Sequence, residues 1–183
     1  LWVASEEFSE DMQKMGGTEA LNEPYLDMPI FKLFKKRIVW LFILFIGETL
    51  TILAMSNFQK TLEQVLVLST FIPLIISSGG NSGSQAATLI IQALALDEVK
   101  VKDWWRIARR EIQSGLIMGI TLGLLGFLII YGGHYFFGLF GEHFVRIGLA
   151  IGTAITGVVT WGTIMGSMLP LLMKKLGADP AAS

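Results

Sequence analysis

The stretch Pro73-Leu-Ile-Ile-Ser-Ser-Gly-Gly-Asn-Ser-Gly-Ser-Gln85 is a polar, glycine-rich seam between the apolar runs at residues 65–72 and 89–96. A lipid bilayer offers no partner to a free backbone N–H or C=O group. Irregular backbone at membrane depth is therefore tolerated only inside protein or beside a watery cavity. Broken helices with polar groups at that depth commonly form a path for an ion or solute. The seam therefore predicts a membrane protein with a transport pathway.

The composition agrees with a membrane protein. Of the 183 residues, 52% are hydrophobic and 16% are charged, whereas a soluble domain carries roughly 25% charged residues. The net charge of −1 indicates no nucleic-acid partner. There is no cysteine, which excludes disulfides and thiolate metal sites. We expect an all-α, polytopic bundle of transmembrane helices.

Four apolar runs predict four spans, over about 38–57, 64–96, 112–133 and 147–173. Because about 20 residues cross the hydrocarbon core, the second run exceeds one plain span, and we expect Pro73 and Gly79-Gly80 to divide it. Residues 97–111 are expected to form a polar loop or surface helix, and residues 134–146 a short connector.

Residues 1–37 are expected to form a cytoplasmic connecting segment before the membrane domain at 38–183. Residues 5–15 have the period of an amphipathic helix, and Gly16-Gly17 is a stop signal. Residues 1–17 carry no signal-peptide pattern. Because no methionine opens the chain, we expect it to be part of a longer protein.

The basic residues predict the orientation. Of the 14 Lys and Arg residues, only Lys60 and Arg146 lie in the connectors after the first and third spans. The others gather at 14–37, at 100–110 and at Lys174-Lys175. By the positive-inside rule, the N-terminus, the 97–111 connector and the C-terminus lie in the cytoplasm. This predicts a multi-pass protein of the cell membrane.

Polar residues in the second span recur with helical spacing and would share one face: Ser77, Asn81, Ser84 and Thr88. Their hydroxyl and amide oxygens suit a hard cation or its hydration water, while Gly79 and Gly80 leave backbone carbonyls approachable. Small and polar residues are also what membrane helices use to pack together. Both interpretations stay open, and Pro73 with the glycines favours a pathway.

Two further stripes favour helix packing. The fourth span carries hydroxyl residues three or four positions apart: Thr153, Thr156, Thr160, Thr163 and Ser167. The third span carries Gly115, Gly119 and Gly123 in consecutive small-xxx-small steps. Residues of this kind let membrane helices approach closely.

Five carboxylates are candidate cation ligands. Glu48 is the ionisable residue near the middle of a span, and it is either a cation or proton ligand or a neutral acid bonded to a neighbouring helix. Glu7, Glu10 and Asp11 would share a helix face, either as part of a divalent-ion sensor or as a solvated acidic surface. Asp179 would lie on the same side of the membrane and could complete such a sensor.

Several stretches together resemble the MgtE family of bacterial magnesium channels and transporters. Residues 73–88, with Gly-Gly-Asn-x-Gly-x-Gln at 79–85, resemble its second transmembrane helix. Residues 6–11, 16–17 and 23–25 resemble its acidic connecting, or plug, helix and the approach to the first span. Residues 103–111 and 177–180 resemble its cytoplasmic loop and the joint after the fourth helix.

The resemblance implies a homodimer in the lipid bilayer, with five transmembrane helices per subunit and Mg²⁺ as both transported and regulatory ion. The pore would lie on the dimer axis, lined by the second and fifth helices. The principal pore ligand would be an aspartate on the fifth helix, beyond Ser183. Glu7, Glu10, Asp11 and Asp179 match positions that bind regulatory Mg²⁺. The predicted pore-lining set is Pro73, Ser77, Gly79, Gly80, Asn81, Ser84 and Thr88.

The sequence leaves two alternatives open. One is a transporter of other divalent cations such as Co²⁺ or Ni²⁺, which the absence of cysteine and of clustered histidine disfavours. The other is a helical membrane scaffold that transports nothing. No nucleophile–base set, phosphate loop or zinc pattern occurs, so an enzyme is not expected.

Overall fold

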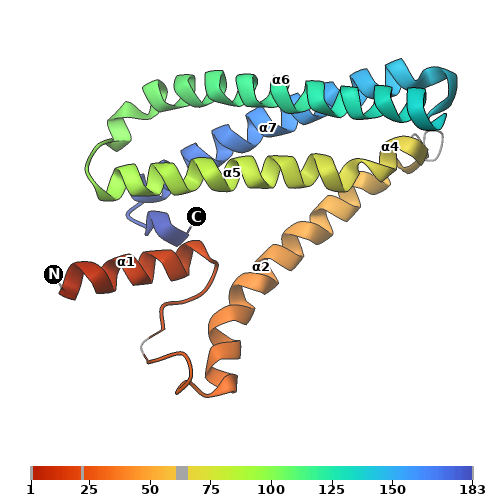
Figure 1. The fold of residues 1–183 in the computed structure, drawn as a ribbon. Helices are drawn as coiled ribbons and strands as arrows, with labels where there is room; N and C mark the ends of the chain where they lie inside the picture. The colour runs from red at the N-terminus through yellow and green to blue at the C-terminus, as the bar shows by residue number, and fades with distance from the viewer. Residues whose placement is uncertain (1, 22, 61–65, 183) are drawn as a thin grey trace. The chain divides into compact units, whose positions relative to one another are not determined.

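The structure, a computed structural model, describes residues 2–21, 23–60 and 66–182, with side chains from residue 9 to residue 181. In these ranges every regular element is helical. Within the described residues, four helices are long and apolar enough to cross a membrane: Ile30–Ser56, Leu66–Ala95, Val101–Phe137 and Gly141–Lys175 (Figure 1). The predicted all-α membrane fold is confirmed. The chain divides into two units, one within residues 1–60 and 181–183 and one within residues 61–180, and each is described by itself.

In the first unit, α1 (Trp2–Met15) ends where the glycine pair predicts. The N–H of Gly17 donates to the carbonyl of Lys14 at 2.8 Å, and the N–H of Thr18 donates to that of Gln13 at 3.1 Å. Gly17 has a φ of +72°, which a residue without Cβ adopts at little cost. This arrangement is a Schellman motif, which satisfies the last carbonyls of the helix.

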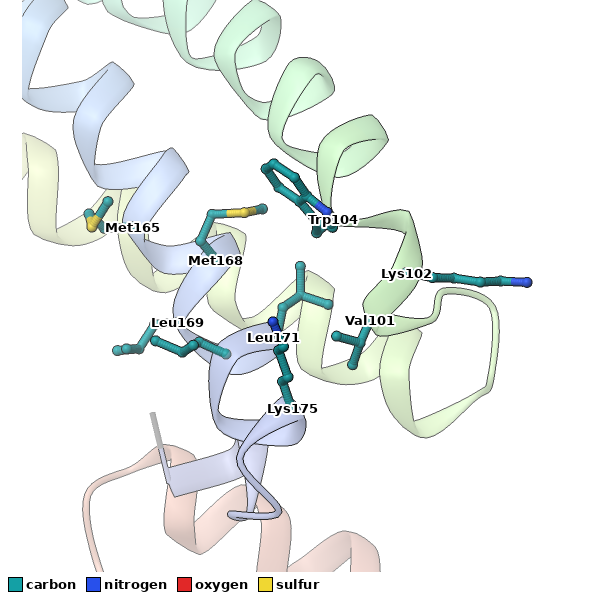
Figure 2. A pocket seen from close by; sticks show the side chains of 9 residues that line it. Val101, Lys102, Trp104, Met165, Met168, Leu169, Leu171 and Lys175 are labelled. Carbon is teal, nitrogen blue, oxygen red and sulfur yellow. The ribbon is translucent and has the colours of Figure 1, made fainter.

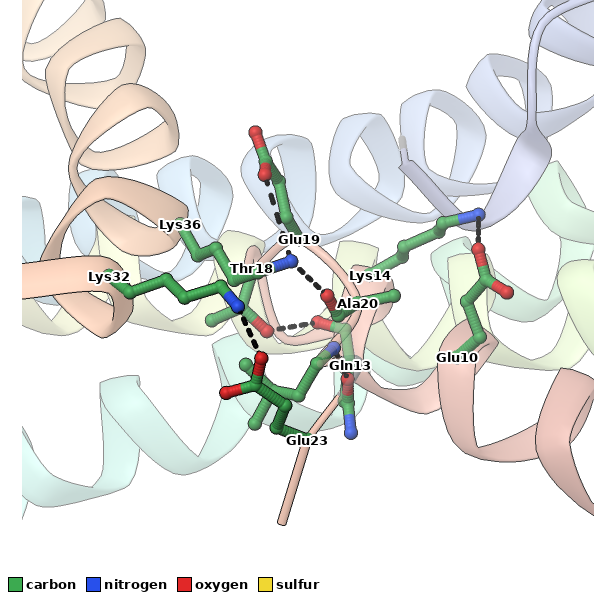
Figure 3. A network of polar contacts seen from close by, with 10 residues as sticks. Glu10, Gln13, Lys14, Thr18, Glu19, Ala20, Glu23, Lys32 and Lys36 are labelled. Atoms are coloured by element: carbon green, nitrogen blue, oxygen red, sulfur yellow. Dashed lines mark hydrogen bonds and ion pairs between the residues drawn. The ribbon is translucent and has the colours of Figure 1, made fainter. Parts of the chain in front are cut away.

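The connecting segment after α1 is held against the first turns of α2 (Ile30–Ser56). The Lys36 ammonium donates to the carbonyl of Ala20, and Lys32 forms an ion pair with Glu23 at 2.6 Å (Figure 3). α2 begins at Ile30, so these basic residues lie in its first turns, before the apolar run at residue 38.

In the second unit, the second apolar run is divided at Phe71. Here α4 (Leu66–Thr70) ends and α5 (Ile72–Ala95) begins, and α5 continues unbroken through Gly79-Gly80. The expected break at the glycine pair is wrong. Pro73 occupies the first turn of α5, where its missing N–H has no helical partner to lose. Each helical glycine costs only about 1 kcal/mol, which close packing can offset.

The next helices, α6 (Trp104–Phe137) and α7 (Phe144–Lys175), extend beyond the predicted spans. Residues 104–111 are the first two turns of α6 and not a separate loop or surface helix. The short turns η1 (Val101–Asp103) and η2 (Gly141–His143) precede α6 and α7, and η3 (Pro180–Ala182) follows α7. Arginine is a good helix former, so the basic residues continue the helix.

α7 packs along both α5 and α6 (Figure 1). A buried cluster holds this arrangement, with Ile130 of α6 beside Ile151, Ile155 and Val159 of α7. The central position of α7 means that its contacts determine how α5 is oriented within this unit.

Glycines allow α6 and α7 to come close. A Cβ added at Gly119 would lie 2.8 Å from the Thr156 carbonyl oxygen, and one at Gly123 would lie 2.5 Å from that of Gly152. The Thr156 hydroxyl donates to the Gly119 carbonyl at 3.0 Å. The packing role predicted for the glycine and threonine stripes is confirmed at these positions.

We expect Gly119→Ala to lower the free energy of unfolding by about 1–3 kcal/mol, because the added methyl group would overlap α7 backbone. Thermal unfolding of the detergent-solubilised protein measures the change. Gly157→Ala on α7 is the matched control, since a Cβ there meets nothing within 4 Å. Equal melting temperatures for the two variants would contradict this account of the packing.

Candidate cation pathway

α5 has two faces of different character. One is buried in the unit and contains Gly79, Ser82, Ala86 and Ile90. The other is exposed and contains most of the predicted pore-lining set: Pro73, Ser77, Gly80, Asn81, Ser84 and Thr88. The structure thus brings six of the seven predicted residues onto one continuous surface.

The buried face of α5 is fitted closely to α7. The Ser82 hydroxyl donates to the Val159 carbonyl at 3.3 Å. A Cβ at Gly83 would lie 3.1 Å from the Gly162 carbonyl oxygen, and one at Gly79 would overlap the Val158 side chain. Gly79, the seventh predicted pore-lining residue, therefore lies in the helix–helix contact.

The exposed face presents oxygen acceptors. The Asn81 amide nitrogen donates to the Ser77 hydroxyl at 3.4 Å, and the Thr88 hydroxyl donates to the Ser84 carbonyl at 2.9 Å. Among the described residues, none donates a hydrogen bond to the side-chain amide oxygen Oδ1 of Asn81. This oxygen and the Ser77 hydroxyl can accept hydrogen bonds from water. The surface therefore suits a hydrated ion better than a bare one.

Gly80 differs from its glycine neighbours. A Cβ added at Gly80 meets nothing within 4 Å, whereas one at Gly79 or Gly83 would press on α7. Packing in the described part of the chain therefore does not require glycine at position 80. A glycine on an exposed helix face leaves the backbone open to close approach by a ligand or another chain.

Glu48 lies on the exposed surface of α2, among apolar residues that are exposed as well. A carboxylate near the middle of a membrane span is costly unless it faces protein or water. The role predicted for Glu48 as an intramembrane ligand stays a prediction.

The other carboxylates lie in both units. Glu10 forms an ion pair with Lys14 at 2.7 Å, and Asp11 is half-buried on the same helix. Asp179 is exposed after the end of α7, in the other unit. The side chain of Glu7 lies outside the described residues. Within the described part of the chain, no three His, Cys, Asp or Glu residues are grouped closely enough to hold a metal ion, and the regulatory site stays a prediction.

The match between the glycines of α5 and α7 was not recognised from the sequence. Gly162 and Gly166 lie opposite Gly79 and Gly83, so that each helix contributes two small residues four positions apart. This equal spacing was the available signal, because paired small-xxx-small steps are typical of crossing membrane helices.

A family model described as a divalent cation transporter, MgtE, matches residues 72–183, which include α5, α6 and α7. The chain belongs to the MgtE family. Curated members of this family named magnesium transporter MgtE are similar over nearly the whole chain. The protein from Thermus thermophilus is 33% identical over 98% of the chain, and that from Enterococcus faecalis is 30% identical over 99%. In each case the chain spans 38% of the relative's length.

The two faces of α5 can be told apart by chemical labelling, because the chain contains no cysteine. In full-length protein without other cysteines, we expect Ser84→Cys to react with a charged, water-soluble thiol reagent. Ser82→Cys, at a position only 7% exposed, should react at least about tenfold more slowly. Leu89→Cys, at an exposed apolar position of the same helix, controls for surfaces that face lipid. Equal labelling at all three positions would contradict a water-lined face.

Proposed function

We propose that this chain forms the membrane-embedded part of a magnesium transporter, with the exposed face of α5 as one wall of the ion path. The observation that carries the proposal is the open position of Gly80, between Ser77 and Ser84 on a face that bears oxygen acceptors. Membership of the MgtE family and the similarity to proteins named magnesium transporter support magnesium as the ion.

Mg²⁺ holds its hydration shell tightly and is bound through water more often than calcium is. Hydroxyl and amide oxygens on α5 would accept hydrogen bonds from that water, so the ion passes largely hydrated. This surface carries no charge, and ion pathways for cations use acidic side chains. A carboxylate must therefore come from another helix. The family resemblance supplies one, an aspartate on a fifth span.

A second copy of the chain would provide the opposite wall. The exposed face of α5 covers only one side of a path, and homodimers with a two-fold axis place the same surface on both sides. In this arrangement, Gly80 of each subunit would face the axis.

We further propose that cytosolic Mg²⁺ closes the path by bridging Glu10 and Asp11 of α1 to Asp179. Carboxylates held together repel unless a cation lies between them. An ion that binds only the closed arrangement shifts the population toward it. The proposal places α1 in the cytoplasm, as the distribution of basic residues predicts.

We expect Gly80→Val to reduce Mg²⁺ flux by roughly tenfold or more, because a branched side chain would project onto the proposed path. The change should leave the fold intact, since nothing lies within 4 Å of the added Cβ. Uptake into liposomes containing the full-length protein measures the flux.

The matched control for this variant is Gly157→Val, an exposed position on α7 that is equally free of contacts. Wild-type flux in Gly80→Val would place the path elsewhere. If the wild-type protein took up no Mg²⁺ in the same liposomes, the result would favour the alternative of a helical membrane scaffold that transports nothing.

We expect Asp11→Ala to raise the Mg²⁺ concentration that half-inhibits the full-length protein by about tenfold, the effect of losing roughly 1.4 kcal/mol of ion binding. Patch recordings with varied cytosolic Mg²⁺ measure it. Asp27→Ala, an exposed aspartate in the connecting segment, is the control. Identical inhibition in the wild type and Asp11→Ala would exclude this residue from the regulatory site.

A second candidate substrate follows from the family model, whose description is divalent cation transporter rather than magnesium transporter. Co²⁺ and Ni²⁺ prefer nitrogen and sulfur ligands more strongly than Mg²⁺ does, and the exposed face of α5 provides only oxygen in its side-chain acceptors. Competition between these ions and Mg²⁺ in the liposome assay separates the two substrates.

A further inference from the structure

A pocket of about 520 Å³ lies where η1 and the start of α6 meet the last turns of α7 (Figure 2). Its wall is apolar, formed by Trp104 on one side and by Met168 and Leu169 on the other. It is separate from the exposed face of α5, because none of its lining residues belongs to that helix.

Two lysines line the pocket. The charged residues that line it are Lys102 and Lys175, and no acidic residue does so. Among the described residues, neither lysine has a carboxylate within ion-pair distance. Figure 2 shows the Lys102 side chain extended away from the helices, on a long stem that can turn toward a bound anion.

The depth of the pocket corresponds to one leaflet of a bilayer. Its lining on α7 runs from Met165 to Lys175, which is about 15 Å along a helix at 1.5 Å per residue. That length is half of the hydrocarbon core of about 30 Å. Trp104 and Trp105 begin α6 beside the lysines, and tryptophans of this kind mark the boundary between headgroups and hydrocarbon.

We propose that this pocket binds an acidic phospholipid, with its phosphate group at Lys102 and Lys175 and one acyl chain along Met168 and Leu169. The apolar wall disfavours a small soluble anion as the occupant, because such an anion would leave the wall in contact with water. Two lysines in a lining that contains no acidic residue disfavour a zwitterionic lipid. A transmembrane helix is a poorer occupant, since it would run through both leaflets whereas the pocket occupies one.

The test uses the full-length protein in nanodiscs and compares phosphatidylglycerol with phosphatidylcholine. Native mass spectrometry of the released protein measures how much of each lipid stays bound. We expect phosphatidylglycerol to be retained, and each of Lys102→Gln and Lys175→Gln to weaken its binding about fivefold. Lys100→Gln is the control, an exposed lysine of the same connector that does not line the pocket. Equal retention of both lipids, or equal loss in Lys100→Gln, would overturn the proposal.

A second measurement locates the acyl chain. Phosphatidylglycerol brominated on its acyl chain should quench the fluorescence of Trp104. The fraction of the total tryptophan fluorescence that is quenched should therefore be smaller in Trp104→Phe than in the wild type. Trp161 is an exposed tryptophan outside the pocket, so the Trp161→Phe variant should retain the quenching that comes from Trp104. No difference between the two variants would mean that another helix or a second copy covers the pocket, and would overturn the proposal. Displacement of the lipid by inorganic phosphate alone would overturn it in favour of a soluble anion.

Discussion

The close approach of α7 to α5 and α6 is the contact on which the membrane unit depends. Lipid tails are as apolar as leucine side chains, so helices in a bilayer gain little from hiding apolar surface from one another. They gain instead from close van der Waals contact and from hydrogen bonds between helices. Gly119 of α6 and Gly83 of α5 allow α7 backbone within contact distance, and Thr156 and Ser82 add hydrogen bonds across the two interfaces.

This contact also decides which surface of α5 remains available for function. Once Gly79 and Ser82 are packed against α7, the rotation of α5 is set, and Asn81 and Ser84 must lie on the other side. A helix with polar residues on one exposed face and small residues on its packed face can be both a structural element and a wall of an ion path. The absence of charge on that wall is consistent with a second surface that supplies the carboxylate.

The ends of α6 and α7 show a different use of charge. Lys175, in the last turn of α7, lines the same pocket as Trp104 at the start of α6. Tryptophans and basic residues at the ends of membrane helices are typical of the level of the lipid headgroups. The same placement that orients the protein would bring lysines to an apolar pocket. Orientation and lipid recognition would then rest on one set of residues, while the proposed ion path would rest on another helix.

The sequence by itself determined the membrane class, the four spans, the end of α1 at its glycine pair and the spacing that gathers Ser77, Asn81 and Ser84 on one face. These follow from hydrophobic length, backbone freedom and helical period, which are local properties. Only the tertiary structure decided that α5 is continuous through Gly79-Gly80, and that these adjacent glycines have different surroundings. They point about 100° apart around one helix, so Gly79 meets Val158 while Gly80 meets open space. The position of α7 makes that difference, and no local pattern in α5 specifies where α7 lies.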